Sequence, residues 1–210
     1  MSAAATRPNA VRKRKAKKPW RDPHDWYCED AEPVESLFDH WQFQGSIYDP
    51  ACGRGNIPEV AKRRGYDSYG TDLIDRGYED IVTTFDFLDA TFVIGCAVNI
   101  VTNPPYGYQK GICEAFIRRA LTLATRSVAV LVPTGFLHSI NRNAFFRVEH
   151  PPTQICYLSK RPSMPPGAKI AELGKMAFKG GKTNFVWIIW DLIDPTPLPP
   201  AFLPARGIAR

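Results

Sequence analysis

Two successive prolines interrupt the middle of this 210-residue chain, directly after a short apolar run. The run covers residues 97–102 with the sequence Ala-Val-Asn-Ile-Val-Thr, which is typical of a buried strand. Neither Pro104 nor Pro105 can donate a backbone N–H to a sheet, so the strand must end at Asn103. Each proline also biases the residue before it toward extended geometry, and the loop that follows is therefore stiff.

This loop would present a specific set of groups at the carboxyl end of the strand. Asn103 offers its side-chain amide, Pro104 a carbonyl oxygen and Tyr106 a flat ring beside them. Two acceptors and a stacking face would suit a planar group with an amino donor, such as the exocyclic amine of a nucleobase. The alternative is that the prolines merely end a strand, and these residues alone do not decide between the two interpretations.

A loop with two glycines follows an earlier strand. Residues 46–49 predict that strand, and residues 57–64 predict a helix after the loop. Strand, glycine loop and helix in this order form the first unit of a doubly wound nucleotide-binding fold. Gly53 and Gly55 would let the backbone approach a ligand where any Cβ would collide.

Acidic residues follow this unit at positions that suit a nucleotide. A second predicted strand ends in Asp72, which is 23 residues after Asp49. In this fold an acid at the end of the second strand commonly accepts hydrogen bonds from ribose hydroxyls, although a solvated turn acid is the alternative. Asp86 could accept from an adenine amine while Phe87 lines the ring, or both could be ordinary loop and core residues.

Other apolar patterns predict the remaining elements. Residues 33–41 carry apolar side chains at helical spacing and predict an amphipathic helix. We expect further helices over residues 114–125 and 136–148, and strands over residues 127–133, 154–158 and 184–190. The alternation of helices and strands predicts an α/β fold, in which the strand before Asn103 is the fourth of a parallel sheet.

The net charge of +6 is concentrated at one end of the chain. Residues 1–21 hold eight lysines and arginines and no acid, whereas the rest of the chain holds 19 basic and 21 acidic residues. We expect residues 1–23 to be a disordered basic arm, either for phosphate backbones or as a solubilising extension. Residues 161–183, with five basic residues and one acid, predict a long loop that either faces a polyanion or is merely solvated.

Cysteine and histidine patterns argue against a metal site. The five cysteines have no C-x-x-C spacing, and the four histidines form no ligand pattern. No segment approaches the roughly 20 apolar residues that span a bilayer. These observations predict free thiols, no metal and a soluble, cytoplasmic protein. Residues 194–210 are expected to be a proline-rich tail without core.

With both motifs placed, the chain resembles the class I S-adenosylmethionine-dependent methyltransferases. Asp-Pro-Ala-Cys-Gly-Arg-Gly at residues 49–55 looks like their cofactor motif. Asn-Pro-Pro-Tyr at residues 103–106 looks like the catalytic motif of amino-methylating members, notably the adenine-N6 DNA methyltransferases. The resemblance covers roughly residues 24–192.

More narrowly, the chain is similar to the short phage and prophage adenine methyltransferases. Their sequences have an Asp-Trp-Tyr motif near the start of the domain, here residues 25–27. They also have an Asp-Leu-x-Asp-Arg-Gly motif, here residues 72–77. A late Phe-Val-Trp strand, here residues 185–187, completes the likeness.

The resemblance implies a Rossmann-like, seven-stranded, mostly parallel sheet over residues 24–193, with helices on both faces and an antiparallel last strand. It implies S-adenosyl-L-methionine as the cofactor, with DNA as the foremost nucleic-acid partner. The implied cofactor-binding residues are Tyr27, Asp49, Pro50, Ala51, Cys52, Gly53, Gly55, Asp72, Leu73, Asp86 and Phe87. The implied catalytic residues are Asn103, Pro104, Pro105 and Tyr106. The candidates for contact with nucleic acid are Tyr106, Tyr108, Lys169, Lys175, Lys179 and Lys182.

The implied reaction is methylation of the N6 amine of adenine in DNA. An aromatic amine is a poor nucleophile because its lone pair is delocalised into the ring. If Asn103 and Pro104 each accept one N–H, the nitrogen becomes pyramidal and its lone pair turns toward the methyl group. Tyr106 would stack on the base, which must be flipped out of a duplex or taken from a single strand.

Other functions stay open at this stage. The same motif occurs in enzymes that methylate a glutamine side chain of release factors and in guanine-N2 ribosomal RNA methyltransferases, and adenine-N6 in RNA is a further target. A non-catalytic nucleic-acid-binding protein is a hypothesis of another class, against which the intact cofactor motif argues. A nicotinamide-dependent dehydrogenase is disfavoured, because Pro58 stands where its third glycine belongs. No segment is long enough for a sizeable target-recognition domain, so residues 161–183, alone or with the basic arm, would have to select the target. The alternatives are a short or relaxed specificity, or a second subunit that supplies it.

Overall fold

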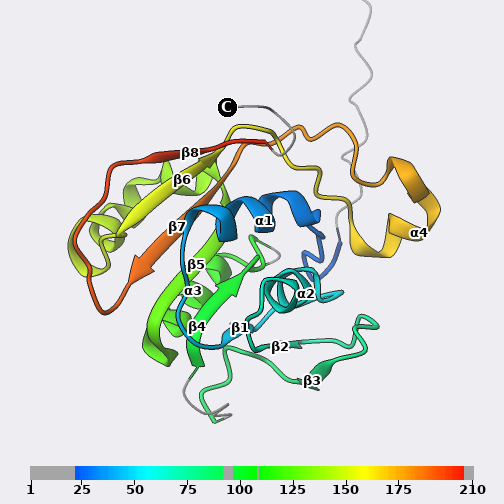
Figure 1. The fold of residues 1–210 in the computed structure, drawn as a ribbon, viewed down its shortest axis with the longest axis horizontal. Helices are drawn as coiled ribbons and strands as arrows, with labels where there is room; N and C mark the ends of the chain where they lie inside the picture. Colours follow the sequence, from blue (N-terminus) through cyan, green and yellow to red (C-terminus); the bar gives the residue numbers. More distant parts are fainter. Residues whose placement is uncertain (1–21, 92–96, 108, 206–210) are drawn as a thin grey trace, which may run out of the picture.

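The computed structural model of the chain describes residues 22–91, 97–107 and 109–205. The described part contains one sheet of eight strands in the order β3-β2-β1-β4-β5-β7-β6-β8 (Figure 1). The strands are β1 (Ile47–Asp49), β2 (Ser68–Asp72), β3 (Ile81–Thr84), β4 (Ala97–Thr102), β5 (Ala124–Pro133), β6 (Gln154–Leu158), β7 (Phe185–Asp191) and β8 (Ala201–Leu203). Of the basic arm expected over residues 1–23, all but the last two residues lie outside the described residues, as does Tyr108.

Strands β3, β2, β1, β4 and β5 run parallel to one another, and β7 is antiparallel to both β5 and β6. The predicted Rossmann-like α/β fold is therefore confirmed. The chain builds outward from β1 to β2 and β3, and then returns to place β4 on the other side of β1. The strand order thus reverses between β1 and β4, and in open α/β sheets ligands bind at the carboxyl ends of the strands at such a point.

Helices cover both faces of the sheet, as Figure 1 shows. The apolar sides of α1 (Ala31–His40) and α2 (Asn56–Arg63) pack on one face with β-strand residues such as Val101 and Trp187. The apolar side of α3 (Ile112–Leu123) packs on the other face with residues such as Ile100. Because successive strand residues point to opposite faces, a strand with both faces covered is apolar throughout. This explains the continuous apolar runs from which β4, β5 and β7 were predicted.

The single helix predicted over residues 136–148 is broken in the structure. This segment forms two 3₁₀-helices, η1 (Thr134–Leu137) and η2 (Ile140–Arg142), and a π-helix, η3 (Phe145–Glu149). A single α-helix would place Phe136 and Phe145 on opposite sides, because they are nine residues apart at about 100° per residue. The broken path instead brings Phe136 to 6.0 Å from Phe146, and Phe145 to 6.3 Å from Trp190, between ring centroids.

The tail expected to lie outside the core contributes an eighth strand. Residues 201–203 pair in parallel with β6, and the side chain of Leu203 is 1% exposed in the core. Prolines flank this strand, which is possible because it lies at the edge of the sheet, where backbone donors need no partner strand. The sheet therefore has eight strands rather than the seven implied by the resemblance, and the antiparallel strand β7 is the last but one in the chain.

The long basic loop between β6 and β7 is compact. It contains the turn η4 (Gly167–Lys169), the short helix α4 (Ile170–Leu173) and the turn η5 (Gly174–Met176). Figure 1 shows this segment extending beyond the sheet beside α1 and α2. Residues 162–165 and parts of 173–183 line an open cleft that Tyr27 and Tyr106 also line.

Candidate functional site

The glycine loop between β1 and α2 forms the floor of a pocket at the reversal point of the sheet. The backbone nitrogen of Gly53 donates a hydrogen bond of 2.9 Å to Asp72 Oδ2, which joins this loop to the end of β2. Gly53 and Gly55 have φ values of 52° and 81°, which lie in the left-handed region that favours glycine. A Cβ on Gly53 would lie 3.1 Å from Trp26 Nε1, so the loop and that indole pack closely.

Residues 22–29, which we call the N-terminal strap, cross this pocket and hold several loops together. The nitrogen of Cys28 donates to the oxygen of Pro165 over 3.0 Å, and the nitrogen of Gly167 donates to the oxygen of Trp26 over 2.9 Å. Asp25 Oδ2 accepts a 2.5 Å hydrogen bond from the backbone nitrogen of Gly107. The strap therefore contacts the basic loop on one side and the loop after β4 on the other.

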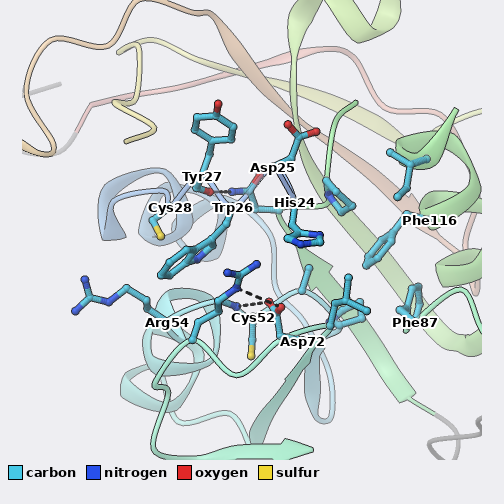
Figure 2. A pocket seen from close by; sticks show the side chains of 18 of the residues that line it. His24, Asp25, Trp26, Tyr27, Cys28, Cys52, Arg54, Asp72, Phe87 and Phe116 are labelled. Carbon is cyan, nitrogen blue, oxygen red and sulfur yellow. Dashed lines mark hydrogen bonds and ion pairs between the residues drawn. The ribbon is translucent and has the colours of Figure 1, made fainter. Parts of the chain in front are cut away.

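The pocket between strap and glycine loop encloses about 750 Å³, part of it open to solvent. Figure 2 shows Trp26 and Tyr27 on one side, Cys52 and Asp72 on the other, and Phe87 and Phe116 near one end. Nine of the eleven predicted cofactor residues line the pocket: Tyr27, Pro50, Ala51, Cys52, Gly53, Asp72, Leu73, Asp86 and Phe87. The other two, Asp49 and Gly55, are buried beside the pocket and are not among its lining residues.

Several carboxylic acids are buried around this pocket. Asp25 of the strap is 6% exposed, and Glu29, Asp49 and Asp72 are 6%, 1% and 8% exposed. Desolvation by burial raises the pKa of Glu29, Asp49 and Asp72, and that of Asp49 most clearly. The mutual repulsion of the acids adds to this, since the charge of Glu29 also raises the pKa of Asp49. A cation in the pocket would favour their ionised forms.

Trp26 and Arg76 extend the wall next to Asp72. The Arg76 guanidinium lies 4.5 Å from the centre of the Trp26 ring, and Arg76 Nε is 3.9 Å from Asp72 Oδ1. A Cβ on Gly167 would overlap the indole, so a glycine there lets the basic loop close against Trp26. Trp26 Nε1 is buried and has no hydrogen-bond partner among the described residues. An acceptor on a bound ligand would satisfy this donor.

Asn103 lies at the end of β4, and both ends of its side-chain amide form hydrogen bonds. Its Nδ2 donates to the oxygen of Tyr27 over 3.0 Å and to Glu29 Oε2 over 2.7 Å. The hydroxyl of Tyr106 donates to Asn103 Oδ1 and also lies 3.1 Å from the oxygen of Leu131. Asn103 and Pro105 line the pocket described above, whereas Pro104 and Tyr106 are not among its lining residues.

A second cleft lies on the other side of this loop. It is an open space of about 1080 Å³ between the loop after β4 and the basic loop. Tyr27 and Tyr106 line it together with apolar residues of the basic loop and Phe185, whose ring centre is 6.0 Å from that of Tyr106. Of the four predicted lysines, Lys179 and Lys182 line this cleft. Lys169 and Lys175 are not among its lining residues.

Eleven of the residues that line the pocket were not named as site residues from the sequence, among them His24, Trp26, Glu29, Arg54 and Arg76. The most informative of these is Glu29, because it contacts Asn103 directly. The two residues are separated by 74 positions in the chain, and no local periodicity connects them. The only available signal was the cluster of acids at the start of the first helix, which ordinarily indicates capping, as Asp30 indeed caps α1.

Metal-ligand clusters and membrane-spanning helices are both absent from the described part of the chain. No group of three or more histidine, cysteine, aspartate or glutamate side chains there could hold a metal ion. No helix within residues 22–91, 97–107 and 109–205 is long and apolar enough to cross a membrane.

Solved structures include proteins of similar fold. One is a candidate RNA methyltransferase from Pyrococcus horikoshii, with 14% sequence identity and a TM-score of 0.54 over 76% of this chain and 81% of that one. The present chain shares that protein's Rossmann-like fold. Another was solved in work on the conversion of a disulfide bond into a thioacetal group during echinomycin biosynthesis. It has 15% identity and a TM-score of 0.54 over 81% of this chain and 85% of that chain. No family model matches the sequence, and neither does any curated protein.

Proposed function

We propose that this protein transfers a methyl group from S-adenosyl-L-methionine to the exocyclic N6 amine of adenine in DNA. The observation that carries the proposal is the position of Asn103 between two cavities. Asn103 lines the first pocket, and Tyr27 and Tyr106, which it contacts, line the second cleft. A methyl donor in the pocket and an amine in the cleft would therefore meet at this side chain.

The pocket has the chemistry that this cofactor requires. S-adenosyl-L-methionine carries two positive charges, on its sulfonium and its ammonium, and would supply an electrophilic methyl group. The negative potential of the buried acids around the pocket would stabilise these charges, and the cations would in turn favour the ionised carboxylates. The unpartnered Nε1 of Trp26 is available to an acceptor on the cofactor. We assign Asp72 to the ribose because it ends β2, where an acid takes that role in this fold.

The loop after β4 would prepare the amine for reaction. Asn103 Oδ1 and the carbonyl of Pro104 would each accept one N–H, which turns the nitrogen lone pair toward the methyl group. Both donor hydrogens of the Asn103 amide are used by Tyr27 and Glu29, and its oxygen accepts from the Tyr106 hydroxyl. The second lone pair of this oxygen is the acceptor that would bind the substrate amine. No covalent intermediate is needed, and catalysis rests on positioning and hydrogen bonding.

The second cleft would receive the flipped base. Tyr106 offers a partly exposed ring, although its hydroxyl points inward to Asn103 and Leu131. Base stacking on an aromatic ring contributes roughly 1–3 kcal/mol. Lys179 and Lys182 at the cleft would contact the phosphates on either side of the base. The choice of adenine in DNA rests on the sequence motifs at residues 25–27, 72–77 and 103–106.

A labelling experiment tests this function. The purified full chain is incubated with S-adenosylmethionine carrying a tritiated methyl group and, separately, with unmethylated duplex DNA, ribosomal RNA or a release factor. We expect label in DNA, recovered after digestion as N6-methyladenine. Label in RNA or in the release factor would show that the same site acts on another substrate. Absence of label with every substrate, while the cofactor binds, would overturn the proposed activity.

A further inference from the structure

The amide of Asn103 must have a defined orientation to work. One end of an amide accepts hydrogen bonds and the other donates them, and only the oxygen can bind an amine N–H. A rotation of this side chain by 180° would present Nδ2 to the substrate, where it would repel the amine. The contacts around Asn103 must therefore stabilise one of two amide orientations that have nearly the same shape.

The surroundings of Asn103 favour one of these orientations. Its Nδ2 donates to the backbone oxygen of Tyr27 and to Glu29 Oε2, at 3.0 and 2.7 Å. In the reversed orientation, Asn103 Oδ1 would face these two acceptors and no donor. Of the two, the Glu29 carboxylate forms the shorter and charge-assisted hydrogen bond, and such bonds are the stronger kind.

Glu29 is itself held in place. The side-chain nitrogen of Asn56 at the start of α2 donates to the backbone oxygen of Glu29 over 2.5 Å. The next residue, Asp30, caps the first turn of α1. The Glu29 side chain is 6% exposed, so water cannot replace it as a partner for Asn103. The loop that contains Asn103 is also held to the strap at Gly107, whose backbone nitrogen donates a hydrogen bond to Asp25 Oδ2.

We propose that Glu29 is a positioning residue, whose ionised carboxylate fixes the Asn103 amide with its oxygen directed at the substrate amine. The proposal rests on the proposed function, because it assigns a role within the same reaction. Glu29 does not touch the substrate. It acts through Asn103, as an acceptor that cannot donate while it is ionised.

This role makes turnover dependent on pH. Burial raises the pKa of Glu29, and a protonated carboxyl group both donates and accepts, so it no longer distinguishes the two orientations. The groups that face Glu29 are Cys28 and Asp30 beside it, Asp49 and Cys52 from β1 and the glycine loop, and Tyr106 from the loop after β4. Of the causes that act on the pKa of Glu29, burial is the largest and the charge of Asp30 adds to it, whereas the hydrogen bond from Asn103 favours the ionised form.

The test compares Glu29→Gln with the wild type and with Glu35→Gln. Glutamine has the same shape but can donate as well as accept. Glu35 is a matched control on α1, because its carboxylate pairs with Arg63 and Arg64 and is remote from Asn103. With DNA and saturating cofactor, we expect Glu29→Gln to lower kcat about tenfold, as for a misoriented catalytic group. The fall of wild-type kcat toward acidic pH should disappear in this variant, and Glu35→Gln should behave as the wild type.

Cofactor affinity separates this role from direct cofactor binding. The positioning role predicts a loss in kcat that is larger than any loss in cofactor affinity measured by calorimetry. If Glu29→Gln instead weakens cofactor binding and leaves kcat at saturation and its pH profile unchanged, the positioning role is wrong. A merely structural role would lower the melting temperature without altering the pH profile.

A spectroscopic measurement keeps this inference separate from the proposed activity. In ¹⁵N-labelled protein, the side-chain NH₂ resonances of Asn103, assigned with Asn103→Ala, should shift as Glu29 titrates. The shift should be absent in Glu29→Gln. If the resonances titrate in a protein that methylates none of the substrates, the orientation by Glu29 stands and the proposed function fails. If the resonances do not respond to pH while the wild type methylates DNA, the inference about Glu29 fails and the function stands.

Discussion

Asp72 accepts a hydrogen bond from the backbone nitrogen of Gly53 through Oδ2, and one from the nitrogen of Ile74 through Oδ1, at 2.9 and 3.1 Å. The carboxylate is thereby held at the junction of the glycine loop and the end of β2, with one edge toward the pocket. Burial raises the pKa of Asp72, whereas these two hydrogen bonds and the charge of Arg76 lower it. The residue therefore has a structural role in the loop and a charge available to a ligand.

Replacement of this carboxylate by an amide should separate the two roles. In Asp72→Asn, the side-chain oxygen can still accept from Gly53, but the bond from Ile74 and the negative charge are lost. We expect a small fall in the melting temperature from the lost bond, and a fall of about tenfold or more in the affinity for S-adenosylmethionine, since hydrogen bonds to charged groups contribute about 1.5–3 kcal/mol. Titration calorimetry measures the affinity. Asp75→Asn is the control, because Asp75 is exposed and bonds only the backbone of Gly77; an equal loss in both variants would contradict this role for Asp72.

Cofactor affinity should rise with pH. The pKa values of Glu29, Asp49 and Asp72 are raised by burial in the free protein, and a cationic ligand binds best when these groups are ionised. From ordinary carboxyl pKa values of about 4 upward, binding should strengthen until these groups are fully ionised, and it should release protons within that range. Calorimetry in buffers of different ionisation enthalpy detects the released protons.

The same groups affect folding in the opposite direction. Their folded-state pKa lies above that of the unfolded chain, so their contribution to the stability of the free protein is present below the unfolded pKa and is lost as pH rises through the folded pKa.

Because the cofactor binds more tightly at higher pH, its stabilisation of the protein should grow as pH rises. S-adenosylhomocysteine lacks the sulfonium charge and should show a shallower pH dependence. Equal slopes for the two ligands would argue against carboxylates near the sulfonium.

Gly55 tests the construction of the glycine loop. Its φ is 81°, and a Cβ there would overlap Cδ2 of the Tyr78 ring. Gly65 has a similar φ of 85°, but no atom lies within 4 Å of the place that a Cβ would occupy. Gly65→Ala should therefore lower the free energy of unfolding only by the left-handed strain, about 1–2 kcal/mol. Gly55→Ala adds a collision with a buried ring and should lower it by about 1–3 kcal/mol more. Urea unfolding of both variants measures the difference. Equal effects would show that the Tyr78 ring can move away from the added Cβ without lowering the free energy of unfolding.

Asn103→Ala should abolish most turnover while the cofactor still binds. It removes the acceptor for the amine but leaves Gly53 and Asp72 in place. A loss of a pre-organised hydrogen-bonding group of this kind lowers kcat by about 10²–10³. Single-turnover labelling measures the rate, and calorimetry measures the affinity. Asn143→Ala, at an exposed position, is the control. Retained turnover with lost cofactor affinity would refute the catalytic assignment.

The sequence predicted those parts of the fold that depend on local pattern. The apolar spacing of Val34, Leu37 and Phe38 places α1, and all three side chains are buried. The prolines after Asn103 end β4 as expected, since Thr102 is its last residue. The eighth strand was missed because residues 201–203 are stabilised by pairing with β6, more than 40 positions earlier, and not by any pattern of their own.

The residues that could be named for the candidate site are limited for the same reason. The glycine loop and the loop after β4 have motifs that are contiguous in sequence, so their residues could be named. Glu29 contacts Asn103 and Trp26 packs close to Gly53, and both partners lie far along the chain. Of the four predicted lysines, only Lys179 and Lys182 lie at the cleft, because of the way the basic loop folds. The backbone path of a loop made of turns has no periodic sequence pattern from which it could be predicted.

Lys179 and Lys182 provide a test of the substrate cleft. Both are exposed and line the cleft, so the variant with both changed to alanine should bind DNA more weakly and release fewer counterions. Each lost phosphate contact should reduce the slope of log affinity against log salt by about 0.9 for duplex DNA. Lys160→Ala is the matched control, because Lys160 is exposed, pairs with Glu32 and lies outside the residues of this cleft. Fluorescence anisotropy at several salt concentrations measures the slopes. A slope unchanged in the double variant would mean that nucleic acid does not approach through this cleft, whereas a reduced slope with unchanged cofactor affinity would separate the two cavities by function.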